Sequence, residues 1–111
     1  MTAKRIYGIM PPPIVPFTAD GEVDAPKLKA YMNWLVDKGC HCLYVLGTFG
    51  SSPLLSVEER KYCAENIVEA VNGRVPVICH IGSQNTKASI TLAKHAVQTG
   101  VDAIASVPPT Y

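Results

Sequence analysis

The feature that most constrains this chain is a regular alternation of short apolar runs with longer segments of helical periodicity. The apolar runs cover residues 6–17, 41–47, 75–82 and 101–109. The segments between them cover residues 24–39, 56–73 and 85–100. Successive runs lie about 30 residues apart, the size of a strand–helix–strand unit. The last three runs are almost continuously apolar, which is typical of parallel strands covered on both faces. We therefore expect an α/β array with parallel strands and right-handed crossovers.

The three intervening segments carry the marks of helix ends as well as helical periodicity. Asp24 is placed to cap the first helix, and Ser56 and Glu59 have the spacing of a capping box at the start of the second. A glycine follows each helix, at positions 39, 73 and 100. The side chains that we expect to face inward are Leu28, Tyr31, Met32, Leu35 and Val36, then Cys63, Ile67, Ala70 and Val71, then Ala88, Leu92, Ala93, Ala96 and Val97.

Two architectures fit such an array, a doubly wound open sheet and part of a (β/α)8 TIM barrel. A polar turn with one glycine follows the first run, where a doubly wound dinucleotide fold would carry a glycine-rich turn. A complete barrel takes roughly 250 residues, whereas this sequence has 111 and reaches only the fourth apolar run. Four parallel strands leave two open edges. We expect residues 1–111 to be the N-terminal half of a single barrel domain, joined to further chain, another copy or another protein.

Composition excludes several classes of protein. Hydrophobic residues make up 48% of the chain and charged residues 17%, which argues against disorder. A net charge of +1 provides no positive field for nucleic acid. No apolar run approaches the roughly 20 residues of a membrane span, and prolines interrupt the apolar part of the N-terminus, so no signal peptide is expected. We expect a cytoplasmic protein with reduced thiols.

The cysteines and histidines do not predict a metal site. Cys40, His41 and Cys42 lie at the start of the second apolar run, with Cys40 just before it, whereas Cys79 and His80 lie well along the third. On neighbouring parallel strands, Cys42 and Cys79 would be offset by four residues. At about 3.3 Å per residue they would lie about 13 Å apart along the strands, far more than zinc coordination allows. We expect buried free thiols, and for His80 either a hydrogen-bonded place in the core or contact with a ligand.

The loop that follows the second run, "LGTFGSSP", is the candidate ligand site. It combines two glycines with three hydroxyl side chains between a strand and a helix, where unpaired N–H groups and the helix dipole favour an anion. Gly47 and Gly50 would let the backbone approach a ligand closely. A tight turn with Thr48 as a local cap, and a phosphate-binding loop of a doubly wound domain, both remain open from the residues alone. A hydrolase elbow does not fit, because "GTFGSS" lacks the Gly-x-Ser-x-Gly spacing.

Four consecutive motifs resemble the dihydrodipicolinate synthase and N-acetylneuraminate lyase family. They are "GIMPPPIVPFTADGEVD", "LGTFGSSP", "LLSVEER" and the stretch from "RVPVICHIGSQ" to "VPPTY". The resemblance covers the whole chain in register. It implies a TIM barrel that runs Schiff-base chemistry on pyruvate or a related 2-keto acid with an aldehyde partner, as a homo-oligomeric dimer or tetramer without a cofactor.

The resemblance also implies roles for particular residues. Thr48 would belong to a proton relay, and the loop containing Gly47, Thr48, Phe49 and Gly50 would bind the keto-acid carboxylate. Tyr111 would complete the relay from across a tight dimer interface. Phe49, together with Ser51 and Thr110, departs from the family pattern, so the aldehyde or sugar-acid substrate stays open.

The resemblance places the Schiff-base lysine on a later strand, beyond Tyr111. The seven lysines of this chain precede the first run or lie on the expected helices: Lys4, Lys27, Lys29, Lys38, Lys61, Lys87 and Lys94. An amine nucleophile needs burial to lower its pKa, which the surface of a helix does not provide. We therefore expect the 111-residue chain alone to be inactive. A catalytically inactive fragment that oligomerises through its open barrel face is the alternative from a different class.

Overall fold

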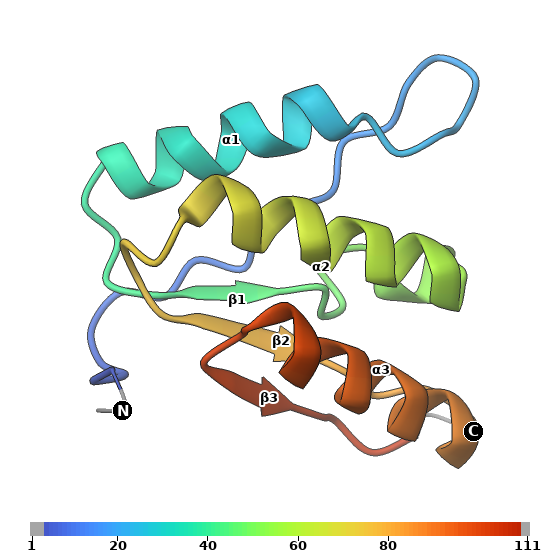
Figure 1. Ribbon diagram of the computed structural model, residues 1–111. Helices are drawn as coiled ribbons and strands as arrows, with labels where there is room; N and C mark the ends of the chain where they lie inside the picture. Colours follow the sequence, from blue (N-terminus) through green and yellow to red (C-terminus); the bar gives the residue numbers. More distant parts are fainter. Residues whose placement is uncertain (1–3, 110–111) are drawn as a thin grey trace.

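The computed structural model describes residues 4–109 as three parallel strands and three helices in alternation (Figure 1). The elements are α1 (Ala25–Asp37), β1 (Leu43–Val45), the short 3-10 helix η1 (Ser52–Leu54), α2 (Val57–Val71), β2 (Val77–His80), α3 (Thr86–Thr99) and β3 (Ala103–Ala105). The strands lie in the order β1-β2-β3. Each strand therefore pairs with the next along the chain, as in a barrel, and no reversal of strand order creates the crevice of a doubly wound sheet.

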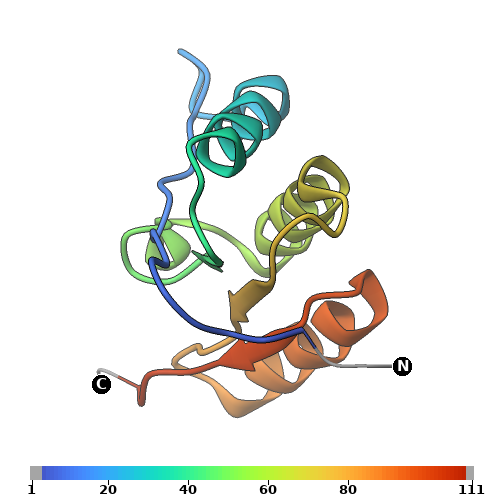
Figure 2. The ribbon, with the colours of Figure 1, turned by 90° about the vertical axis from the view of Figure 1, so that its left-hand side faces the viewer.

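The helices line one face of this sheet and follow the order of the strands (Figure 2). α2 contacts both α1 and α3. The pairing of Leu43 with Val77 and of Ile78 with Ala103 fixes the parallel register. Because the register is parallel, the carboxyl ends of all three strands meet at one edge, and the loops that follow them gather there.

The first apolar run, residues 6–17, forms no regular strand, so the prediction of a fourth strand is wrong. The run lies alongside β1, where the carbonyl of Ile9 accepts from the N–H groups of His41 and Cys42 and the carbonyl of Pro11 accepts from Tyr44 N–H. Three consecutive prolines, residues 11–13, have no N–H group with which to complete the ladder. The run thus occupies the place of a first strand, but in its backbone-to-backbone hydrogen bonds with residues 41–44 it provides only carbonyl groups.

The predicted helix caps are confirmed. The Asp24 carboxylate accepts from the N–H of Lys27 at 3.1 Å. Ser56 and Glu59 form a complete capping box, with each side chain accepting the backbone N–H of the other residue. Glycines 39, 73 and 100 have φ angles of 93°, 73° and 97°, the left-handed conformation that ends a helix.

The core lies between the sheet and the helices and contains most of the side chains predicted to face inward. The fully or almost fully buried ones from the helices are Leu28, Met32, Leu35, Cys63, Ile67, Val71, Leu92 and Ala96. Val97 was predicted to face inward, yet 71% of it is exposed. α3 packs on α2 along one flank only, and in the described part of the chain its other flank has no helical neighbour.

Within residues 4–109, no helix is both long enough and apolar enough to cross a membrane.

Candidate active site

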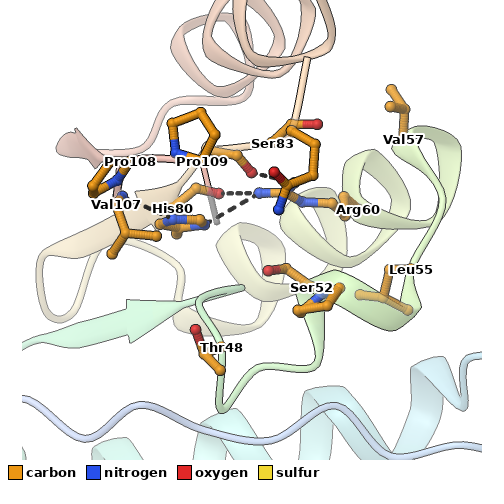
Figure 3. A pocket seen from close by; sticks show the side chains of 13 residues that line it. Thr48, Ser52, Leu55, Val57, Arg60, His80, Ser83, Val107, Pro108 and Pro109 are labelled. Atoms are coloured by element: carbon orange, nitrogen blue, oxygen red, sulfur yellow. Dashed lines mark hydrogen bonds between the residues drawn. The ribbon is translucent and has the colours of Figure 1, made fainter. Parts of the chain in front are cut away.

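A cavity of about 380 Å³ opens at the carboxyl ends of the three strands (Figure 3). Parts of the loops after β1, β2 and β3 line it, together with the first turn of α2. The lining residues are Thr48, Ser52, Pro53, Leu55, Val57, Arg60, His80, Gly82, Ser83, Gln84, Val107, Pro108 and Pro109. This edge is where enzymes with parallel barrels build their active sites. The candidate loop from the sequence therefore lies at the expected place.

The loop after β1 presents three N–H groups that the rest of the described chain does not use. The N–H of Ser51 donates to the carbonyl of Thr48 at 3.1 Å, and the N–H of Ser52 donates to the carbonyl of Gly47 at 3.2 Å. These two bonds close the turn. No acceptor within residues 4–109 takes the N–H groups of Thr48, Phe49 or Gly50. Three consecutive free donors in a loop whose Thr48 lines the cavity are suited to an anion such as a carboxylate.

The two loop glycines are required by the packing of the loop itself. A Cβ atom at Gly50 would lie 2.7 Å from the backbone nitrogen of Leu46, and one at Gly47 would lie 2.7 Å from the ring of Tyr44. Leu46 itself has a φ angle of 61°, and Ser51 has one of 64°. A left-handed conformation costs a residue other than glycine about 1–2 kcal/mol. The loop therefore holds backbone strain where strain commonly accompanies function.

Arg60 is a buried residue of this site for which the sequence suggests no role. Its side chain crosses from α2 to the end of β2, where Nη1 donates to the carbonyl of Gly82 at 2.7 Å and Nη2 donates to the carbonyl of His80 at 2.8 Å. Only 5% of Arg60 is exposed. Its position three, four and seven residues before Cys63, Ala64 and Ile67 puts it on the buried stripe of α2, which is the pattern that could have revealed it.

The charge of Arg60 has no acidic partner among the ion pairs of the described residues. Its Nε atom is buried without a hydrogen-bond partner in the same part of the chain. Burial lowers the pKa of Arg60, but a guanidinium stays protonated in proteins. The wall of the cavity thus contains a positive charge that an anion could balance.

His80 is a hydrogen-bonded core residue, which confirms the first of the two roles expected for it. Its Nε2 atom accepts the N–H of Val107 at 3.2 Å. Burial lowers the pKa of His80, and the Arg60 charge lowers it further, while a hydrogen bond to the backbone of Leu46 acts in the opposite direction. His80 also lines the cavity, so the second expected role, contact with a ligand, remains geometrically open.

The other residues named from the sequence are distributed as follows. Thr48 is exposed and lines the cavity, whereas Phe49 is 73% exposed and is not among the lining residues. Thr110 and Tyr111 lie outside the described residues. None of the seven lysines is buried and none lines the cavity, which confirms their predicted surface placement.

All four cysteines are free, and three of them, Cys42, Cys63 and Cys79, are buried as expected. Burial raises the pKa of Cys63 to about 12 and that of Cys79 to about 11, so both thiols stay protonated at neutral pH. Residues 4–109 contain no group of three or more histidine, cysteine or acidic side chains that could hold a metal ion.

Comparisons with known proteins identify the family. Residues 5–111 match the model of the dihydrodipicolinate synthetase family. The chain is 47% identical over 104 residues to 4-hydroxy-tetrahydrodipicolinate synthase from Rhizobium meliloti, and this match covers 94% of the chain and 35% of that protein.

Solved structures agree. The fold superposes on Proteus mirabilis N-acetylneuraminate lyase with a TM-score of 0.93 at 34% identity, covering 97% of this chain and 37% of that one. It also superposes on YagE from E. coli K12, a member of the dihydrodipicolinic acid synthase family solved in complex with pyruvate. That match has a TM-score of 0.91 at 39% identity and covers 94% of this chain and 35% of that one.

The chain spans about a third of the length of the relatives it matches. Its three strands and three helices correspond to part of their TIM barrel, in agreement with the fold expected from the sequence. The chain belongs to the dihydrodipicolinate synthetase family, a family of aldolases and lyases.

Proposed function

We propose that this chain forms the carboxylate-binding part of an aldolase or lyase site that acts on pyruvate or a related 2-keto acid. The observation that carries the proposal is the row of free N–H groups of Thr48, Phe49 and Gly50 at the carboxyl end of β1. The buried charge of Arg60 in the adjacent cavity wall makes the same region favourable for an anion. A relative with 39% identity, YagE, was solved with pyruvate bound.

In the proposed reaction a lysine amine condenses with the keto carbonyl and releases water. The resulting Schiff base withdraws electrons from the adjacent carbon, which then loses a proton to give an enamine. The enamine attacks the aldehyde carbonyl and forms a carbon–carbon bond, and hydrolysis of the product Schiff base frees the lysine. Cleavage of a substrate runs through the same steps in reverse. The N–H groups of the loop hold the carboxylate and fix the keto acid. The hydroxyl of Thr48, which faces the cavity, and the phenol of Tyr111 pass the proton.

The lysine of this reaction is not among the seven in the chain, which are all exposed or half-buried. We propose that it belongs to the remainder of the barrel, because the chain spans about a third of its relatives. Residues 1–111 are then the N-terminal half of one domain, and the chain alone is inactive. The active form is a homo-oligomer in which Tyr111 enters the site of a neighbouring copy.

Two measurements test this proposal. Intact mass after incubation with pyruvate and borohydride should show no adduct on the 111-residue chain, but a stable adduct on a polypeptide that contains the rest of the barrel. An adduct on the 111-residue chain would contradict the assignment of its lysines to the surface. Absence of an adduct on the longer polypeptide would contradict the Schiff-base mechanism.

The carboxylate site can be tested separately by titrating pyruvate into the isotopically labelled longer polypeptide. The amide resonances of Thr48, Phe49 and Gly50 should shift together, whereas the amides of Ser51 and Ser52, which already donate within the loop, should shift less. Thr48→Val removes the hydroxyl but keeps the N–H group, so it should lower turnover and preserve these shifts. Unchanged resonances of all three amides at saturating pyruvate would refute carboxylate binding by this loop.

A second candidate is an inactive fragment that assembles through its open edges. Exposed apolar side chains favour it, with Ile9 and Ile14 beside β1 and Ile104 and Val107 on or after β3. Light scattering on the 111-residue chain should then show a defined oligomer. A monodisperse monomer would exclude this candidate.

A further inference from the structure

We propose that His80 is a positioning residue whose neutral imidazole fixes the segment after β3, residues 107–109, against the carboxyl ends of β1 and β2. This inference rests on the proposed function, because that segment leads directly to Tyr111 and the loop after β1 contains Thr48. His80 would thus set the relative position of the two parts of the chain that supply the proton relay.

The hydrogen bonds of the segment single out His80. The last ladder bond between β2 and β3 runs from Ile81 N–H to the carbonyl of Ala105 at 2.9 Å. Beyond it, residues 107–109 contain one N–H group, that of Val107, because Pro108 and Pro109 have none. The Nε2 atom of His80 accepts this N–H at 3.2 Å. The imidazole therefore takes the only backbone donor that the segment has.

The same imidazole also lies beside the end of β1. The backbone of Leu46, the strained residue that turns β1 into the Gly47–Ser52 loop, is close enough to the ring to raise the pKa of His80. Figure 3 shows the ring between Val107 on one side and Arg60 on the other, with Thr48 across the opening. The side chain of His80 on β2 thus lies against the carboxyl ends of both neighbouring strands, β1 and β3.

The space around the ring restricts its orientation. A Cβ atom at Gly82 would lie 2.8 Å from Nε2 of His80 and 2.7 Å from the hydroxyl oxygen of Ser106. The absence of a side chain at position 82 therefore leaves room for the imidazole beside the segment after β3. The ring of Tyr44 lies on β1 with its centroid 6.4 Å from that of His80.

The hydrogen bonds also determine which form of the imidazole fits. Both ring nitrogens face an N–H donor, with Val107 N 3.2 Å from Nε2 and Arg60 Nη2 3.4 Å from Nδ1, and a neutral ring can accept at only one of them. We assign the acceptor role to Nε2, because the Nη2 atom of Arg60 already donates to the carbonyl of His80 at 2.8 Å. The neutral ring then carries its proton on Nδ1. In a protonated ring the N–H group at Nε2 would face the N–H group of Val107, and a second positive charge would lie beside Arg60.

Two of the three influences on the pKa of His80 favour this neutral form, and the backbone of Leu46 acts against them. Burial lowers the pKa of His80, and the Arg60 charge on α2 lowers it further. The neighbouring Cys79, whose pKa is raised to about 11, carries no charge at neutral pH. The bond to Val107 is therefore stable at pH 7 and is lost in acid, once the ring is protonated.

Matched variants test the positioning role in a polypeptide that contains the whole barrel. In His80→Gln the amide can reach the place of Nε2 and accept from Val107, whereas in His80→Asn it reaches only the place of Nδ1. We expect His80→Asn to lower kcat about tenfold or more, because misplacement of a reacting group by about 1 Å has effects of that order. KM for the keto acid should change less than about twofold, and His80→Gln should restore most of kcat. An unchanged kcat in His80→Asn, or equal losses in both variants, would overturn the proposal.

A second measurement does not depend on activity. Nitrogen chemical shifts of the His80 ring at pH 7 should show the proton on Nδ1, and the amide resonance of Val107 should move with the titration of His80. A proton on Nε2, or a Val107 amide that ignores this titration, would overturn the His80–Val107 contact. Failure of the wild-type protein to act on any 2-keto acid, with these shifts as expected, would instead refute the proposed function alone.

Discussion

Replacement of Arg60 by alanine should destabilise the protein by about 2–4 kcal/mol. The guanidinium donates to the carbonyls of Gly82 and His80 at 2.7 and 2.8 Å. A hydrogen bond to a charged group contributes roughly 1.5–3 kcal/mol, so the two bonds together contribute about 3–6 kcal/mol. Part of this is offset because the variant no longer buries a charge. Water that enters from the adjacent cavity can also satisfy the two carbonyls in part.

Urea unfolding of a polypeptide that contains the whole barrel would measure this effect, with the slope of the unfolding free energy unchanged. Arg60→Lys is the matched control, since an ammonium keeps the charge but lacks the planar fork that reaches both carbonyls. It should give an intermediate loss of about 1–2 kcal/mol. A loss below about 0.5 kcal/mol in the alanine variant, or a gain in stability for Arg60→Met, would refute the reasoning. The free-energy cost of burying the charge would then exceed the contribution of its hydrogen bonds.

Three further predictions concern the loop, the thiols and a helix cap. Gly50→Ala places a Cβ atom 2.7 Å from the nitrogen of Leu46, so the loop must shift, and pyruvate affinity should fall at least tenfold by calorimetry, against no change for an alanine at the exposed Thr91 of α3. Because burial raises the pKa of Cys63 to about 12, the unfolded thiol loses its proton first, and stability should fall by about 1.4 kcal/mol per pH unit between about pH 9 and 12. The urea midpoint of Cys63→Ala should not show this fall with pH. The same pH dependence in the variant and the wild-type protein would contradict the prediction. Ser56→Ala removes the N-cap of α2 and should lower the free energy of unfolding by about 1 kcal/mol. An unchanged free energy of unfolding would show that the cap does not stabilise the helix.

Local patterns in the sequence were sufficient to predict most of the fold. Helix caps such as Asp24 and the Ser56–Glu59 box act between residues three positions apart, so their spacing alone identifies them. The run at residues 6–17 shows the limit of apolar composition as a guide. Its three prolines cannot donate to a ladder, and this property of the backbone outweighed the apolar side chains.

The candidate site was predicted in position but not in composition. The loop at Thr48 follows a strand and precedes a helix, which places it at the carboxyl edge of any parallel sheet. Arg60 received no role because an arginine on a helix is normally exposed. Its burial depends on two carbonyls that lie 20 and 22 residues further along the chain.

The sequence by itself determined the order of strands and helices and the place of the loop, since periodicity, capping and turn chemistry act over a few residues. Only the tertiary structure decided which residues contact one another at the carboxyl ends of the strands. His80 and Val107 are 27 residues apart, and they meet because the parallel register of β2 and β3 brings both to one edge. Spacing along a chain does not encode such a contact, because it depends on the packing of complete elements against one another.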